Sequence, residues 1–125
     1  MNWILLAILV GVVAWMTFNY FRVRKAAQVV GNETFASLIR TGQLIDVRDA
    51  SEFQVKHILG ARNIPSSQFK LSMNALRKDK PVLLYENSRG QRVMNAALAL
   101  KKAGYKEIYI LSYGLDSWDG KVKKS

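Results

Sequence analysis

Cysteine is absent from this 125-residue chain, and histidine occurs once. The chain can therefore form no disulfide, no thiolate metal site and no covalent intermediate on a cysteine sulfur. Acidic residues are also scarce, because 9 Asp and Glu face 19 Lys and Arg, which gives a formal net charge of +10. Such a charge is compatible with nucleic acid or an anionic membrane as a partner. The length allows one modest domain with an appendage.

Charged residues are missing altogether from residues 1–21. Residues 3–21, WILLAILVGVVAWMTFNYF, are almost uniformly apolar, and a helix of this length reaches about 28 Å, close to the thickness of a bilayer's hydrocarbon core. A cleaved signal peptide and a buried helix of a soluble domain are the alternatives. A signal peptide would carry basic residues before the apolar run, whereas here Arg22, Arg24 and Lys25 follow it. We therefore predict an uncleaved single-pass transmembrane helix over 3–21, with the N-terminus outside and the rest of the chain in the cytoplasm.

The remainder divides into three parts. We predict a basic juxtamembrane tether over 22–31, a domain over 32–120 and a basic tail over 121–125 that is too short and polar to pack. Within the domain, the apolar runs 82–85 and 108–111, and the apolar residues around Asp46 in 44–47, are typical of strands, and apolar residues recur at helical spacing in 35–39 and 93–100. This alternation predicts an α/β domain with a central, mainly parallel sheet flanked by helices.

Residues 81–92, PVLLYENSRGQR, read as a buried strand that runs into a polar loop and opens a helix. At the carboxyl end of a parallel strand, a loop that precedes a helix offers unpaired amides to an anion. The sequence therefore predicts an anion-binding loop formed by Asn87, Ser88, Arg89, Gly90, Gln91 and Arg92.

This loop resembles the active-site loop of the rhodanese-like domain family. The family's Cys-x-x-x-x-Arg spacing matches residues 87–92 with Asn87 in the cysteine position, and the longer Cys-x-x-x-x-x-Arg spacing of related phosphatases and arsenate reductases places Glu86 there. The segments LIDVRDASEF, HILGARNIP and YILSYGLDSW resemble further family motifs, so that the likeness covers roughly 34–120. It implies a rhodanese-like fold, but the nucleophile of the implied sulfurtransferase reaction is missing in both registers.

Two hypotheses remain open for the loop. Either it binds a small anion weakly through its amides, Arg92 and Arg89, or the side chain of Glu86 or Asn87 fills it, with Glu86 as an internal anion partnered by Arg92.

Other polar residues in the family-like motifs are expected to be structural. Asp46 is predicted to accept backbone hydrogen bonds and Arg48 to pair with Glu52, although these residues also suit an acid/base and an anion ligand. The lone His57 is expected to hydrogen-bond backbone rather than to act as a general base.

We thus predict a membrane-anchored, cytoplasmic binding or regulatory module without sulfurtransferase catalysis, a cofactor or a metal. Its partners would be the bilayer, through residues 3–21, and an unidentified protein or small anion. The alternative is a sulfurtransferase or phosphatase-like enzyme that uses a non-cysteine nucleophile or a partner's thiol. Nucleic acid is disfavoured, because the basic residues are scattered and no nucleic-acid-binding motif accompanies them.

Overall fold

The computed structural model describes the backbone of residues 2–88 and 90–124, and the side chains of these residues except 19–26. The helices are α1 (Trp3–Ala26), α2 (Asn32–Ile39), α3 (Ala50–Val55), α4 (Phe69–Ser72) and α5 (Gln91–Lys102), with short 3-10 turns at Ser66–Gln68, Met73–Ala75 and Leu115–Ser117. The strands are β1 (Gln28–Val30), β2 (Gln43–Asp46), β3 (Lys56–Ile58), β4 (Arg62–Asn63), β5 (Val82–Tyr85), β6 (Ile108–Leu111) and β7 (Val122–Lys124).

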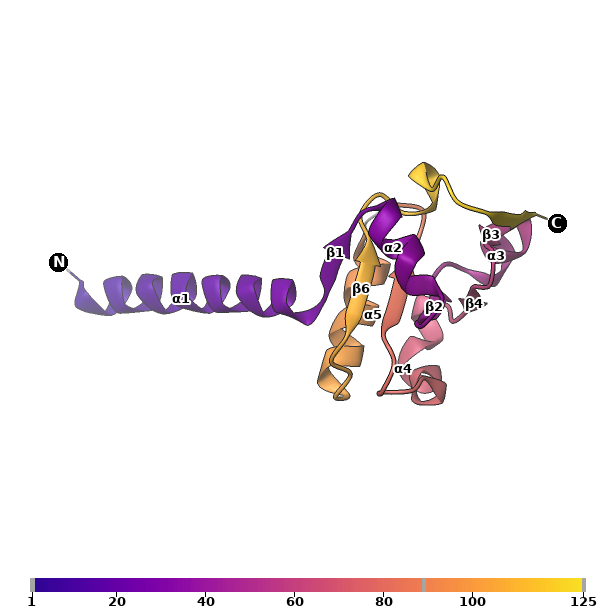
Figure 1. The fold of residues 1–125 in the computed structure, drawn as a ribbon. Coiled ribbons are helices and arrows are strands. Elements are labelled where there is room, and N and C mark those ends of the chain that lie inside the picture. Colours follow the sequence, from indigo (N-terminus) through magenta and orange to yellow (C-terminus); the bar gives the residue numbers. More distant parts are fainter. Residues whose placement is uncertain (1, 89, 125) are drawn as a thin grey trace.

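Five of the strands form a parallel sheet in the order β1-β6-β5-β2-β4 (Figure 1). The central strand β5 is fully buried because helices cover both of its faces. Strands β5 and β6 comprise the same residues as the predicted apolar runs, so the α/β fold with a parallel sheet is confirmed. Because these strands are parallel, the loops that follow them, including the loop after β5, lie together at the carboxyl edge, on one side of the domain.

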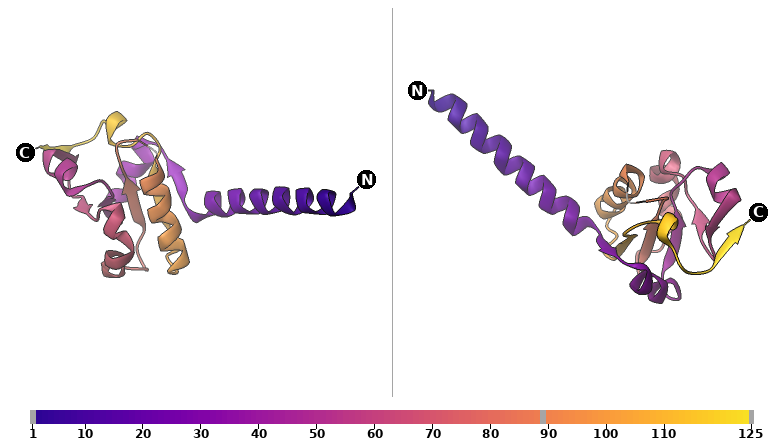
Figure 2. Two further views of the ribbon diagram at one scale, coloured as in Figure 1. Left: turned by 180° about the vertical axis from the view of Figure 1, so that it is seen from behind. Right: turned by 90° about the horizontal axis from the view of Figure 1, so that it is seen from above.

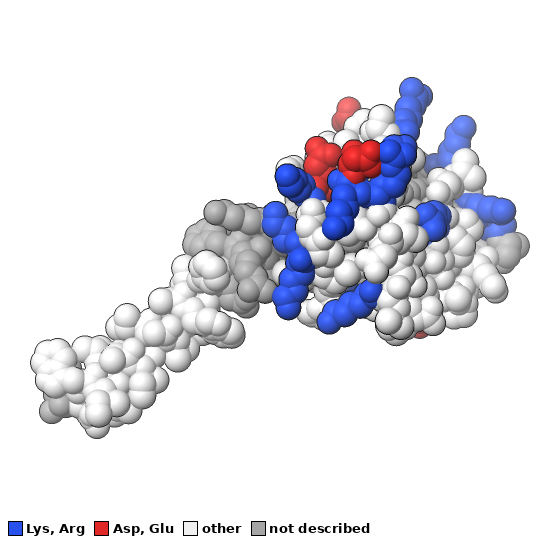
Figure 3. Space-filling view, turned by 90° about the horizontal axis from the view of Figure 1, so that it is seen from below, with Lys and Arg blue, Asp and Glu red and all other residues white. Residues whose placement is uncertain are grey.

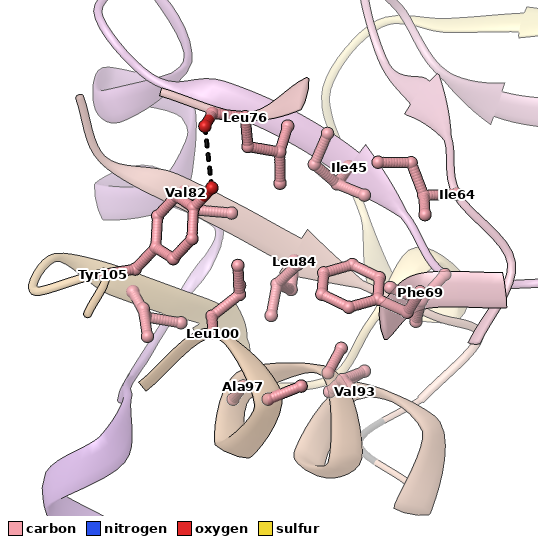
Figure 4. Packing of buried hydrophobic residues seen from close by; sticks show 14 of the residues in the cluster. Ile45, Ile64, Phe69, Leu76, Val82, Leu84, Val93, Ala97, Leu100 and Tyr105 are labelled. Atoms are coloured by element: carbon pink, nitrogen blue, oxygen red, sulfur yellow. Dashed lines mark hydrogen bonds between the residues drawn. The ribbon is translucent and has the colours of Figure 1, made fainter. Parts of the chain in front are cut away.

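Alternate residues of β5 point into two separate apolar clusters. Val82 and Leu84 pack against Val93, Ala97 and Leu100 of α5 (Figure 4). On the opposite face, Leu83 and Tyr85 join a second cluster, whose other members come one each from α2, β2, β3, β6 and the turn after β6. This second cluster consists of Phe35, Leu44, Ile58, Leu83, Tyr85, Leu111 and Leu115. The two clusters fix β5 and α5 rigidly, and with them the loop that joins them.

Two segments differ from the sequence-based expectation. Residues 28–30 of the predicted tether form β1, an edge strand in which Gln28 lies opposite Tyr109 of β6. Residues 122–124 of the predicted tail form β7, which pairs antiparallel with β3 so that Lys123 lies opposite His57. In both cases the backbone finds hydrogen-bond partners on a strand distant in sequence, and Val30 and Val122 pack against the second cluster.

The N-terminal segment is helical, as predicted, and α1 projects away from the domain (Figures 1 and 2). Apart from Thr17, its described side chains are apolar, and they are exposed; Trp3 is 75% and Phe18 67% exposed. Within the part of the chain that the structure describes, no helix combines the length and the apolar character that a membrane crossing requires. The transmembrane span predicted over 3–21 is therefore not confirmed.

Candidate functional site

The candidate site is the loop between β5 and α5, at the carboxyl edge of the sheet. The turn after β6 supports it from behind, because the N–H groups of Leu115 and Asp116 donate to the carbonyls of Glu86 (2.8 Å) and Asn87 (2.9 Å). Gly114 permits this approach: its φ is +66°, and a Cβ atom there would lie 2.5 Å from the carbonyl oxygens of Glu86 and Asn87. The path of the loop is thus set by a segment almost thirty residues further along the chain.

Glu86 directs its carboxylate back into the loop and is only 6% exposed. Its Oε2 accepts hydrogen bonds from the backbone N–H groups of Gly90 (3.2 Å) and Val93 (2.9 Å), and its Oε1 accepts one from Nε of Arg92 (3.0 Å). Helix α5 has Gly90 at its N-cap and no side-chain cap from that residue, so Glu86 supplies the acceptor and the negative charge that a helix start favours. The hypothesis that Glu86 fills the loop as an internal anion partnered by Arg92 is confirmed.

Arg92 joins this carboxylate to a second one. Its Nη1 donates to Oε1 of Glu52 at 3.0 Å, and the side chains of Arg92 and Glu52 are about one-third exposed. The hydrogen bond with Glu52 is the main reason why the pKa of Arg92 is raised, with a further contribution from Glu86. The same bond, followed by one from Asn87, lowers the pKa of Glu52. Arg92 and Glu52 therefore stay ionised near neutral pH.

Asn87, which occupies the cysteine position in the shorter register, does not fill the loop. Its Oδ1 accepts a hydrogen bond from Nη1 of Arg48 (3.0 Å), and its Nδ2 donates one to Oε2 of Glu52 (2.9 Å). Asn87 thus bridges a cation and an anion from the segment after β2. A neutral amide suits this place because it offers an acceptor to one neighbour and a donor to the other.

Asp46 and Arg48 form a buried ion pair. Asp46 is fully buried and accepts the backbone N–H of Arg48 (2.8 Å), which confirms the predicted backbone role. Its carboxylate also receives Nε and Nη2 of Arg48, at 3.1 and 2.8 Å. The predicted pairing of Arg48 with Glu52 is wrong, because the Arg48 side chain folds inward, where a buried guanidinium needs a buried counter-charge. Glu52 instead faces Arg92.

The other candidate residues lie outside this network. Ser88 is exposed, and Gln91 donates its side-chain amide to Asn95, one turn along α5 (2.8 Å). Arg89 lies outside the described residues. His57 places Nδ1 2.8 Å from the carbonyl oxygen of Phe53 and stacks on the ring of the same residue, as a structural histidine does.

Sequence reasoning missed the backbone N–H of Val93, which makes the shorter of the two amide contacts to Glu86. One signal could have revealed it: a helix start that lacks Ser, Thr, Asp or Asn at the N-cap and has a glutamate a few residues earlier.

Beside the loop lies an open hollow of about 330 Å³, lined by Arg48, Glu52, Val55, Lys56, Asn87, Leu115 and Asp116. Glu86, Gly90 and Val93 do not line it, so the hollow does not lead to the loop amides. A larger hollow of about 550 Å³ is lined by residues of the α4 region and α5, and it shares no lining residue with the first. Within the described residues no cluster of His, Asp and Glu is arranged to hold a metal ion.

A parallel sheet with a strand–loop–helix site at its carboxyl edge is the arrangement of a rhodanese-like domain, and residues 32–121 match the model of that family. The chain therefore belongs to the rhodanese-like domain family. It is similar to YqhL of Bacillus subtilis, an uncharacterized protein, with 44% identity over 123 residues, which are 98% of this chain and 96% of YqhL.

Solved structures also resemble this one. A rhodanese-related protein from Thermoplasma volcanium superimposes with a TM-score of 0.70 at 23% identity over 77% of this chain and 97% of its own, which shows the shared fold. An Escherichia coli rhodanese solved with anions has a TM-score of 0.57 at 28% identity, over 67% of this chain and 99% of its own.

Proposed function

We propose that this chain is a rhodanese-like domain without sulfurtransferase catalysis that serves as a binding or regulatory module. One observation carries the proposal: the carboxylate of Glu86 occupies the Gly90 and Val93 amides and the Arg92 guanidinium. An anionic substrate would need these same donors. Because the chain also lacks a thiol, the loop has no sulfur nucleophile, and Glu86 already holds these three described donors.

The electrostatics of the loop also act against a weak site for small anions. Among the described side chains, Asp46, Glu52 and Glu86 contribute three carboxylates, which pair with the two guanidinium groups of Arg48 and Arg92. An anion from solution would have to displace Glu86, a tethered ligand whose effective concentration at the loop is far above that of a free ion. The module would therefore recognise a protein partner through its outer surface rather than a small anion through its loop.

A sulfur-transfer assay tests the proposal. Native chain incubated with thiosulfate and cyanide is expected to form thiocyanate no faster than buffer does. Sustained formation by the native chain alone would overturn the proposal in favour of an enzyme with a non-cysteine nucleophile. Formation that requires added dithiothreitol would point to a borrowed thiol. Hydrolysis of p-nitrophenyl phosphate above the buffer rate would indicate the phosphatase-like alternative.

We propose further that α1 attaches the domain to a lipid bilayer. The support lies in its side chains, because apolar residues such as Ile4, Leu9 and Trp15 are more than half exposed around the helix. Exposed apolar surface of this extent is costly in water, at about 25 cal/mol for each Å². The basic residues Arg22, Arg24 and Lys25 follow at the end nearest the domain, which favours a cytoplasmic domain and an external N-terminus.

Flotation measures this attachment directly. The full chain mixed with neutral phosphatidylcholine vesicles is expected to float with them and to resist extraction by alkaline carbonate. A chain that stays at the bottom of the gradient would contradict it. In intact spheroplasts of an expressing bacterium, external protease is expected to spare the domain, and cleavage of the domain would reverse the proposed orientation.

A further inference from the structure

The larger of the two hollows lies between residues 66–70 and residues 95–102, and we name it the α4–α5 groove. Its volume of about 550 Å³ is within the range of sites that hold small molecules. None of its lining residues belongs to the Glu86 loop or lines the hollow beside that loop. The α4–α5 groove is therefore separate from the site described above.

The floor of the groove is apolar. Phe69, Ala96 and Ala99 are buried members of the first core cluster, and Leu98 lies partly exposed beside them. Close packing of the core behind these residues holds the floor in place. A ligand with an apolar part would cover this floor and remove apolar surface from water.

Polar side chains border the floor, and none of them is acidic. Lys70 comes from α4 and Lys102 from the last turn of α5, while Ser66, Ser67 and Asn95 add groups that can donate hydrogen bonds. Both lysines are exposed, and no described carboxylate lies within ion-pair distance of either. The border of the groove thus offers two positive charges to a ligand.

The sequence on both sides of the groove adds to this positive charge. Residues 53–78 and 87–106, which contain all the lining residues, include no Asp or Glu. Of the acidic residues that follow directly after these two segments, Asp79 is paired with Arg77. Figure 3 views the domain from the end where α4 and the last turn of α5 lie, and more Lys and Arg than Asp and Glu side chains cover that end. The two segments therefore attract an anion to the groove.

We propose that the α4–α5 groove binds an amphiphilic organic phosphate. The phosphate group would contact Lys70 and Lys102, and the apolar part would cover the floor. Because α4 contacts α5, the flexible stems of the two lysines allow both ammonium groups to reach one phosphate, whose charge of about −1.5 to −2 at pH 7 matches theirs. A lipid with a terminal phosphate and a soluble organic phosphate share this chemistry. The inference needs neither the Glu86 loop nor a thiol and thus goes beyond the proposed function.

Pyridoxal 5′-phosphate is a direct probe of this site. Its aldehyde condenses with a lysine amine to an imine and water, and borohydride then reduces the imine to a stable secondary amine that mass spectrometry locates. The full chain in neutral detergent micelles is treated with the probe or with pyridoxal, which lacks the phosphate. The ratio of the two modification yields cancels the intrinsic reactivity of each lysine. This ratio is expected to be roughly fivefold higher at Lys70 and Lys102 than at Lys121 and Lys123, the factor that about 1 kcal/mol produces. The two tail lysines are a demanding control, because they lie in a basic segment but line no groove.

Competition then separates the possible ligands. Phenyl phosphate is expected to protect Lys70 and Lys102 from the probe. Inorganic phosphate is expected to need a roughly tenfold higher concentration, because it cannot cover the floor; about 55 Å² of apolar surface at about 25 cal/mol for each Å² gives this factor. Protection by dihexanoyl phosphatidic acid at a lower concentration than phenyl phosphate would identify a lipid as the source of the ligand. The reverse order would identify a soluble organic phosphate.

Two pairs of variants isolate the groove. Ser67→Trp places a bulky ring at an exposed lining position and is expected to remove the preference for the groove lysines, whereas Ser51→Trp, at an exposed position of α3 outside the groove, is expected to keep it. Lys102→Gln is expected to lower the ratio at Lys70 roughly fivefold. Lys106→Gln removes the same charge outside the groove and is expected to leave that ratio unchanged. Circular dichroism checks that each variant is folded.

Contrary outcomes are equally clear. Equal ratios at the groove and tail lysines, or an unchanged preference in folded Ser67→Trp, would overturn the inference. Equal protection by inorganic phosphate and phenyl phosphate would also overturn it, because the lysines would then attract any anion without the floor. None of these results concerns Glu86 or thiocyanate formation, so a failure here is distinguishable from a failure of the proposed function.

Discussion

Replacing Glu86 by alanine tests whether its carboxylate is the ligand of the loop. The change removes the hydrogen bonds to Gly90, Val93 and Arg92 at once. A hydrogen bond to a charged group is worth about 1.5–3 kcal/mol, and breaking a buried ion pair by removing one partner costs about 3–5 kcal/mol. Arg92 is one-third exposed and keeps Glu52, and water can reach part of the loop, which lowers the cost. We therefore expect the free energy of unfolding to fall by about 3 kcal/mol.

Urea unfolding of the full chain in detergent micelles, followed by circular dichroism, measures this loss. With a urea m-value of about 1–3 kcal/mol/M, the midpoint is expected to fall by roughly 1–3 M. Glu107→Ala is the matched control, because Glu107 is an exposed glutamate of the same domain and makes no described ion pair. Its unfolding free energy is expected to stay within about 0.5 kcal/mol of the native value.

The same variant also frees the donors for an external anion. Thiosulfate is expected to raise the midpoint of Glu86→Ala and to leave that of the native chain unchanged, because an anion that binds only the folded state stabilises it by mass action. The reasoning is refuted if Glu86→Ala is as stable as the native chain. It is also refuted if thiosulfate stabilises both chains equally, since the loop would then be open while Glu86 is present.

Three further predictions follow from the loop and its supports. Asn87→Cys introduces a thiol at the cysteine position of the shorter family spacing but leaves the Glu86 carboxylate on the loop amides. The variant is therefore expected to form thiocyanate from thiosulfate and cyanide no faster than buffer does. Thiocyanate formation above the buffer rate would contradict this. The pKa of Glu52 is lowered in the folded state, by Arg92 first and then by Asn87. Ionised Glu52 therefore stabilises the fold above its unfolded-state pKa of about 4.3. This stabilisation is lost as the pH falls through the lower pKa of the folded state. The unfolding free energy of the native chain is thus expected to drop more steeply below about pH 4.3 than that of Glu52→Gln, and parallel curves would show that the pair contributes nothing. Gly114→Ala forces a Cβ to 2.5 Å from the loop carbonyls at a φ of +66°, and is expected to destabilise the domain by more than about 2 kcal/mol in urea unfolding, whereas a neutral effect would mean that the loop can shift freely.

The elements that the sequence predicts well are those with a strong local pattern. A strand covered on both faces must be apolar throughout, so 82–85 and 108–111 stand out from the polar residues around them. Strands β1 and β7 carry no such pattern, because they are short and partly exposed, and form only when β6 and β3 are in place beside them. No local signal could have separated them from a tether and a tail.

Ion pairs were predicted less well, for a related reason. Arg48 and Glu52 are four residues apart, which makes them natural partners in a short helical turn. The fold instead offers Arg48 the buried carboxylate of Asp46, and brings Arg92 to Glu52 from forty residues away. Burial decides such choices, since a buried charge must find its counter-charge whereas an exposed one gains little from it.

The sequence alone determined that this chain has no thiol, that its loop lies between a buried strand and a helix start, and that a charge-free helix precedes a strongly basic remainder. It left open whether Glu86 or Asn87 fills the loop, because neighbouring residues that leave a strand point in different directions and the turn at Gly114 sets the path. Only the tertiary structure placed the carboxylate of Glu86 on the helix amides. It also brought residues 66–70 and 95–102 together around one groove, because Phe69 of α4 and the apolar face of α5 pack into the same core cluster.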